Sequence, residues 1–92
     1  MLRIDVPSSG PSGLTFTELQ KYDIPHPQLG FDPEINDDVV MLFEDEQQAI
    51  DYAHDVDVYA GSLDHTSQEY MIIADMIKAI SDDEFVQAYI QS

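Results

Sequence analysis

The clearest pattern in the chain is a short run, Val39 to Phe43, that is apolar at every position. Its β-branched residues and its lack of alternation predict a strand that is buried on both faces. With its preceding residue this strand spans 38–43, and it is the strongest of an expected two to four short strands. Residues 2–6 are a second expected strand. In the 14–19 segment apolar residues alternate with threonines, which is a weaker strand signal.

Three helices are expected in the second half of the chain, at about 45–55, 66–80 and 82–91. Each follows a pattern that caps helix N-termini, in which Asp, Thr or Ser precedes Glu or Gln by three positions. Residues 55–59 alternate between polar and apolar, which also predicts a short edge strand there. In the last helix we expect four residues to point inward: Phe85, Val86, Tyr89 and Ile90.

Two segments contain many helix- and strand-breaking residues, and we expect both to be irregular. Segment 7–13 has two Pro and two Gly in seven residues, and segment 23–37 contains three further Pro and one Gly. Taken with the strands and helices, this organisation predicts a single small α+β domain, 1–92. A chain of this length is near the lower limit of what folds alone.

The helix expected at 66–80 has an unusually wide apolar surface. On a helical wheel its apolar residues cover roughly 220°, whereas a typical surface helix has a stripe of about 100°. Such a helix lies either in the centre of the core or at a subunit interface. We therefore expect a homodimer, formed through this helix or through the 39–43 strand.

The chain is strongly acidic, since 19 Asp and Glu oppose three Lys and Arg for a formal net charge of −16. Between Lys21 and Lys78 there are 14 acidic residues and no Lys or Arg. The chain is nevertheless 43% hydrophobic and 10% aromatic, unlike a disordered acidic tail. This combination predicts a folded domain with an acidic surface. Because nucleic acid and anionic membranes repel such a surface, the expected partner is a basic protein.

The compartment is suggested by what the sequence lacks. There is no cysteine, which excludes disulfides, thiolate catalysis and zinc held by Cys. No apolar run approaches the ~18 residues of a membrane span, and the first residues do not have a signal-peptide pattern. We expect a cytoplasmic protein, in a bacterial host if a phage encodes it.

The candidates for catalysis or metal binding are three histidines, His26, His54 and His65. Ser62, Asp64 and His65 are close in sequence, but neighbours in one turn rarely point at one another as a catalytic triad requires. The acids before Gly61 do not match a calcium loop, and there is no Gly-rich phosphate loop. We expect no enzyme, no cofactor and no functional metal site.

The sequence Gly61-Ser62-Leu63-Asp64, which precedes an apolar helix, resembles the Asp-Ser-Leu prosthetic-group site of acyl carrier proteins. Proteins of that family are also small and acidic, and they have four helices. An Asp precedes the serine in that family, whereas Gly61 precedes it here. The resemblance implies a carrier protein that uses Ser62, which is one alternative function.

Asp51 and Asp55 lie on one face of the first expected helix, about 6 Å apart along its axis. Phosphates rise ~3.4 Å per nucleotide along the DNA axis and lie further apart along their winding path. A row of carboxylates can therefore replace phosphates in a protein groove built for nucleic acid. Tyr52 and Tyr59 flank this stretch and are either binding anchors or core residues. The acids expected to face the partner are Asp37, Asp38, Glu44, Asp45, Glu46, Asp51, Asp55, Asp57 and Asp64.

In composition and charge the whole chain resembles the small acidic DNA-mimic inhibitors of phages and mobile elements, of the anti-restriction or anti-CRISPR type. The resemblance implies an inhibitor that mimics nucleic-acid phosphates. It would block, stoichiometrically, a basic nucleic-acid-binding protein such as a host defence nuclease or a CRISPR complex. The main alternative is an acidic immunity-type or adaptor module, whose target site need not bind nucleic acid.

Overall fold

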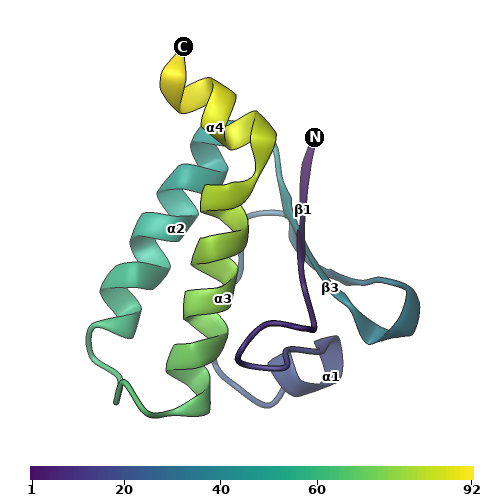
Figure 1. Cartoon of the computed structure of the whole chain (residues 1–92), viewed down its shortest axis with the longest axis vertical. Coiled ribbons are helices and arrows are strands. Elements are labelled where there is room, and N and C mark those ends of the chain that lie inside the picture. The colour runs from purple at the N-terminus through teal and green to yellow at the C-terminus, as the bar shows by residue number, and fades with distance from the viewer.

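A computed structural model describes all 92 residues and confirms the α+β class. A three-stranded antiparallel sheet lies beside two long helices that pack against each other, and a short helix closes one end (Figure 1). The elements, in chain order, are β1 (Leu2–Val6), α1 (Phe16–Leu19), β2 (Gly30–Pro33), a 3₁₀ turn (Ile35–Asp37), β3 (Val39–Phe43), α2 (Glu46–Ala60), α3 (Gln68–Asp82) and α4 (Glu84–Gln91).

The apolar strand β3 lies in the centre of the sheet, between β1 and β2. Ile4 of β1 and Phe31 of β2 both pair with Met41, one from each side. Four of the five β3 residues are buried and Leu42 is half-buried, as expected for an apolar run without alternation. Val39, Met41 and Phe43 join a core cluster of 18 buried residues to which both long helices contribute.

Two predictions for the first half of the chain are wrong. The 14–19 segment is not a strand: Thr15 accepts a hydrogen bond from the Glu18 amide and begins α1, because a threonine hydroxyl competes well for the N-cap role. The 23–37 segment, expected to be irregular throughout, contains β2. Its Gly30 has a φ of 98°, and Pro33 is tolerated because β2 is an edge strand.

The three expected helices are present with shifted ends. Asp45 caps α2 by accepting from the Gln48 amide at 2.9 Å, as predicted. The helix then continues to Ala60, so the expected edge strand at 55–59 is wrong. That segment packs Val56 and Ala60 against the core at helical spacing, which outweighs its short alternation. The N-caps of the next two helices are Ser67 and Asp83, slightly later than predicted.

The apolar surface of α3 is covered within the chain. Ile72, Ile73, Met76 and Ile80 are all buried, and α3 contacts α2, β1 and α4. The cover is incomplete, since Ile77 is half-buried and Ala74 is exposed. The central strand β3 likewise has no free edge, because both of its edges pair with neighbours. The fold thus uses both edges of β3 and much of the apolar surface of α3, and the homodimer stays a prediction.

The helix α4 is less buried than the sequence predicts. Of the four residues expected to point inward, only Val86 is buried, whereas Phe85, Tyr89 and Ile90 are exposed. The reason is positional: α4 is eight residues long and lies at one end of the molecule, where it contacts only α2 and α3 to any extent. An apolar helix face at the end of a molecule can remain open to solvent.

Few charges are compensated inside the chain. Arg3 pairs with Asp5 and Glu34, Lys21 pairs with Glu18, and all of these pairs are at the surface. Most of the 19 acidic side chains therefore have no cationic partner. Their mutual repulsion opposes the compact state.

Substitution of Asp83 tests how much its N-cap hydrogen bonds stabilise α4. Its carboxylate accepts hydrogen bonds from the Phe85 and Val86 amides at 2.9 and 3.0 Å. We expect Asp83→Ala to lower the free energy of unfolding by about 1 kcal/mol, the usual cost of a lost N-cap. The matched control is Asp82→Ala, which removes the same charge from an exposed neighbour. Urea denaturation of both variants measures the difference, and equal effects would show that charge alone matters.

Screening of the surface charge tests how strongly repulsion among the acidic side chains lowers the stability that burial of the core provides. We expect added sodium chloride to raise the urea midpoint progressively up to 1 M, where the Debye length is about 3 Å. Choline chloride should act similarly, because the effect is screening and not the binding of one cation. A midpoint that does not change with either salt would contradict uncompensated repulsion.

Candidate protein-binding surface

The acids predicted to face a partner are mostly accessible. Six of the nine are exposed, and the other three are half-buried. The exposed six are Glu44, Asp45, Asp51, Asp55, Asp57 and Asp64, and the half-buried three are Asp37, Asp38 and Glu46. Exposure is what a surface for a basic partner requires, but the nine acids lie in separate places.

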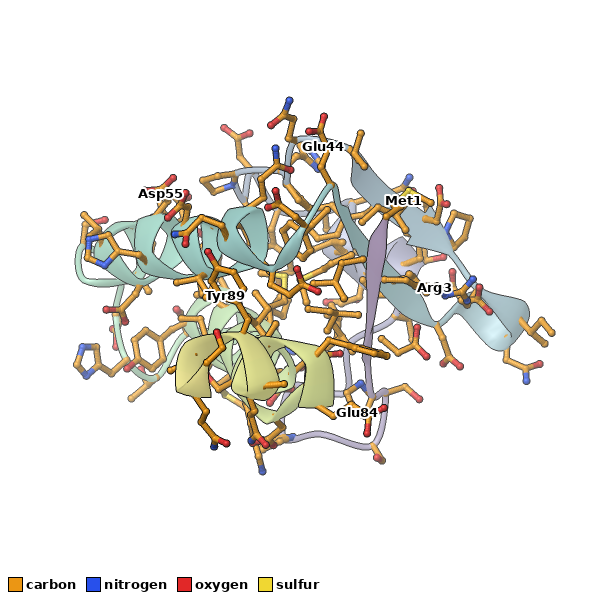
Figure 2. All side chains as sticks on the ribbon, turned by 90° about the horizontal axis from the view of Figure 1, so that it is seen from above. Met1, Arg3, Glu44, Asp55, Glu84 and Tyr89 are labelled. Atoms are coloured by element: carbon orange, nitrogen blue, oxygen red, sulfur yellow. The ribbon has the colours of Figure 1, made fainter.

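Four of them follow one side of α2, which we call the α2 face: Glu44, Asp45, Asp51 and Asp55. Figure 2 shows Glu44 and Asp55 near opposite ends of this side, both pointing outward. The row is held by local hydrogen bonds, since the Gln47 amide donates to Asp51 at 2.9 Å. No Lys or Arg pairs with any of the four. The α2 face is thus a row of carboxylates without cations.

A shallow hollow of about 320 Å³ runs along the α2 face. The Gln48 side chain connects its two walls, because it accepts from the Glu44 amide at 3.0 Å and donates to Gln28 at 2.8 Å. The residues that line the hollow are His26, Gln28, Phe43, Gln48, Asp51, Tyr52 and Asp55. Two of the four carboxylates, those of Asp51 and Asp55, therefore border a concave surface.

Other predicted acids lie elsewhere. Asp37 and Asp38 are at the turn between β2 and β3, where the Asp37 carboxylate accepts from the Thr17 amide at 3.2 Å. Asp57 borders a groove between α2 and α3 that also contains Lys78. Asp64, in the loop after α2, accepts from the backbone amide and the hydroxyl of Thr66, and these bonds lower the pKa of its carboxyl group. Asp37 and Asp64 thus accept local hydrogen bonds, and none of these four acids belongs to the α2 face.

The two candidate tyrosine anchors are committed to internal contacts. Tyr52 is a core residue: its ring packs against Phe43 with centroids 5.6 Å apart, and its hydroxyl donates to the Pro25 carbonyl at 2.6 Å. Burial raises the pKa of the Tyr52 hydroxyl. Tyr59 is half-buried, and its hydroxyl lies 3.0 Å from the Glu69 carboxylate, which raises its pKa. Neither ring is free to insert into a partner.

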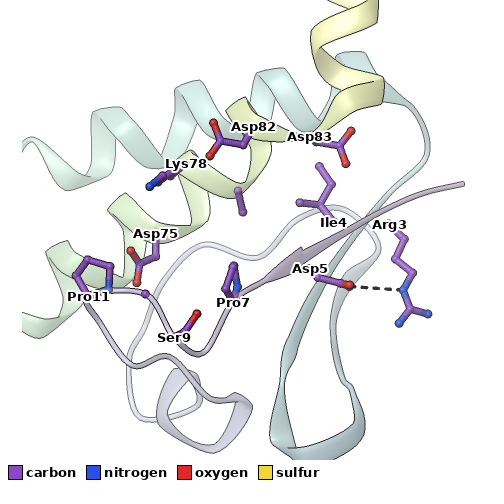
Figure 3. A pocket seen from close by; sticks show the side chains of 12 residues that line it. Arg3, Ile4, Asp5, Pro7, Ser9, Pro11, Asp75, Lys78, Asp82 and Asp83 are labelled. Atoms are coloured by element: carbon purple, nitrogen blue, oxygen red, sulfur yellow. Dashed lines mark ion pairs between the residues drawn. The ribbon is translucent and has the colours of Figure 1, made fainter.

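The largest cavity, about 630 Å³, lies on another part of the molecule, between β1, the following loop and α3 (Figure 3). It differs in charge from the α2 face, because Arg3 and Lys78 lie among its acids. The residues that line it are mainly polar, with only two hydrophobic side chains. Its acids are Asp5, Asp75, Asp82 and Asp83.

Asp75 is a structural residue that the sequence analysis missed. It is buried, and its carboxylate accepts from both the backbone amide and the hydroxyl of Ser12. These bonds fasten the 7–13 loop to α3. Gly10 is needed beside it, because a Cβ at that position would come within 2.8 Å of the carboxylate. The available signal was an Asp inside the apolar stripe of α3, next to Met76.

The remaining candidates for chemistry do not assemble into a site. The Ser62 hydroxyl donates to the Tyr59 carbonyl, and the His65 ring stacks on Tyr70 with centroids 4.5 Å apart. His26 packs edge-on against Phe31. No group of three or more His, Asp or Glu side chains is arranged to hold a metal ion. None of the helices has the length and apolarity needed to cross a membrane.

Comparison with known proteins assigns no function to this surface. No family model matches the chain, and no curated protein or solved structure is significantly similar to it. The α2 face is thus interpreted from its own charge and shape.

Proposed function

We propose that this protein is an acidic inhibitor that presents carboxylates in place of nucleic-acid phosphates. It occupies, stoichiometrically, the basic surface of a nucleic-acid-binding protein, such as a defence nuclease or a CRISPR complex of a bacterial host. The observation that supports this most directly is the α2 face, an exposed row of four carboxylates with no Lys or Arg paired to it.

The spacing of the row suits a surface that binds phosphates. Asp51 and Asp55 are one helical turn apart, about 6 Å along the axis, and Asp45 lies about 9 Å before Asp51. Lys and Arg side chains are long and flexible enough to follow such intervals. Because the carboxylates are exposed, they keep much of their hydration until the partner arrives. The net charge of −16 would steer a basic partner toward the molecule from a distance.

Two other functions remain to be separated from this one. An acidic immunity-type or adaptor module would use the same acids against a basic surface that does not bind nucleic acid, so DNA and RNA would not displace it. A carrier protein would bear a prosthetic group on Ser62, which adds a fixed mass to the chain. The four-helix fold that the carrier resemblance implies is not the fold of this chain.

Competition with nucleic acid tests the proposal. The tagged protein is used to capture its partner from a bacterial lysate, and the partner is identified by mass spectrometry. We expect DNA or RNA to displace the partner, and the affinity to fall steeply from 50 to 500 mM salt, because charge pairs are screened. A complex that nucleic acid cannot displace contradicts phosphate mimicry and supports the adaptor. Intact mass of the captured protein tests the carrier.

Charge removal tests whether the α2 face is the surface involved. We expect Asp51→Asn with Asp55→Asn to weaken binding of the captured partner about tenfold, from about 1 kcal/mol or less for each exposed pair. The matched control, Asp5→Asn with Asp82→Asn, removes the same charge from exposed residues at the cavity that contains Arg3 and Lys78. Isothermal titration or surface plasmon resonance measures both. Equal losses would mean that net charge matters and the α2 face does not.

A further inference from the structure

One end of the molecule gathers exposed apolar side chains, which elsewhere are scattered. Met1, Phe85 and Tyr89 are 85%, 58% and 44% exposed. Phe85 and Tyr89 are one turn apart on α4, and Met1 lies beside Phe85 on the rim of a shared hollow. We call these three residues the α4 patch. Single exposed apolar residues need no explanation, but a contiguous group is typical of an interaction site.

The α4 patch is bordered by acids. The hollow of about 220 Å³ beside Phe85 is lined by Met1, Leu2 and Phe85 on one side and by Glu44, Asp45 and Glu46 on the other. The Tyr89 hydroxyl donates to the Gln47 side chain at 2.8 Å, which fixes α4 against this first turn of α2. Figure 2, which looks onto this end, shows Met1 and Glu44 on the same side of the molecule and Tyr89 further away, between α4 and α2.

The patch is continuous with the α2 face. Glu44 and Asp45 belong to the α2 face, and they also line the hollow beside Met1 and Phe85 of the α4 patch. A partner that contacts Asp51 and Asp55 would therefore reach the α4 patch along one continuous surface. The surface as a whole has an apolar end and an acidic row, and an apolar centre beside charged groups is the usual arrangement of a binding interface.

The acidic residues around the α4 patch indicate what kind of partner can bind there. A second copy of this chain would place its own acids, at a net −16, against Glu44, Asp45 and Glu46. An anionic membrane is repelled in the same way. A basic segment is attracted, and the aliphatic stem of Lys or Arg can lie over the Phe85 ring while its charged end reaches a carboxylate. Met1, as a flexible thioether side chain, can adapt to the apolar side chain of such a segment.

We propose that the α4 patch and the acids at the start of α2 bind a basic amphipathic segment of the partner, with a large apolar side chain in the hollow beside Phe85. This inference rests on the proposed function in taking the partner to be a basic protein. The acidic row then supplies steering and orientation, and the α4 patch supplies an anchor that salt does not screen.

The test uses a synthetic peptide and does not need the natural partner. The probe is a fluorescent 14-residue peptide of Leu and Lys, with all Leu on one helical face, and its control is a scrambled peptide of the same composition. At 0.3 M sodium chloride we expect the amphipathic peptide to bind about tenfold more tightly than the scrambled one, as measured by fluorescence anisotropy. Amide chemical shifts should change at residues 44–47 and 85–89.

Variants of the protein locate the anchor. We expect Phe85→Ser to weaken binding of the amphipathic peptide about tenfold at 0.3 M salt, and Tyr89→Ser to weaken it in the same direction. Val58→Ser is the matched control, because Val58 is an exposed apolar residue toward the other end of α2. Circular dichroism checks that each variant is folded. If Phe85→Ser unfolds the protein, the Tyr89→Ser variant and the chemical shifts decide.

Several results would overturn the inference. These are equal losses for the patch variants and Val58→Ser, equal binding of the two peptides, or shift changes confined to Asp51 and Asp55. Sedimentation that shows a dimer abolished by Phe85→Ser would make a second copy the occupant instead. The peptide result is independent of nucleic-acid displacement, so failure of this inference and failure of phosphate mimicry are distinguishable.

Discussion

Burial of β3 is the constraint on which the rest of the structure depends. Its five residues are apolar in succession, so both faces and both edges must be covered. β1 and β2 cover the edges although they lie on either side of a long loop in sequence, and α2 and α3 complete the core. The strand thereby brings Met1 and Leu2 to the start of α2, where the α4 patch and the α2 face meet.

The acidic residues divide by what they do inside the molecule. Asp45 and Asp83 cap helices, Asp75 fastens a loop, and Asp64 closes a turn. Each of these roles places a carboxylate on backbone amides that would otherwise lack a partner. The fold therefore uses part of its own negative charge, which reduces the repulsion that the remaining acids impose. Asp45 has two roles, because its carboxylate caps α2 and is also exposed on the α2 face, whereas Asp51 and Asp55 cap no helix and are available to a partner.

A surface that combines carboxylates with an apolar end can balance two demands. Charge pairs act at long range and orient a partner, but exposed pairs contribute little to affinity and weaken in salt. Burial of one large apolar side chain contributes more and does not depend on salt. The exposed position of Phe85 next to Glu44 has a structural cause, because α4 is too short and too near the end of the molecule to be covered. The same position makes the pair accessible.

Much of the architecture was predictable from local patterns, because strands and helices reveal themselves by periodicity. β3, the three helices, the Asp45 cap and the common side of Asp51 and Asp55 all follow from spacing within one segment. Where several capping residues stand together, as before α3 and α4, the sequence alone does not select one. The wide apolar surface of α3 was also visible in the sequence, and one of its two interpretations, a place in the core, holds for Ile72, Ile73 and Met76.

Features that depend on contacts between segments far apart in the sequence were decided only by the tertiary structure. β2 exists because β3 pairs with it, and its Gly and Pro by themselves indicate a loop. Tyr52 became a core residue because the 25–31 segment folds over it. Asp37 and Asp64 are separated from the α2 face because they lie outside α2, whereas Asp57 lies on another side of α2, beside the groove with α3. The sequence thus determined the charge and the elements. Packing determined which carboxylates share a surface, since that depends on how the elements meet in space.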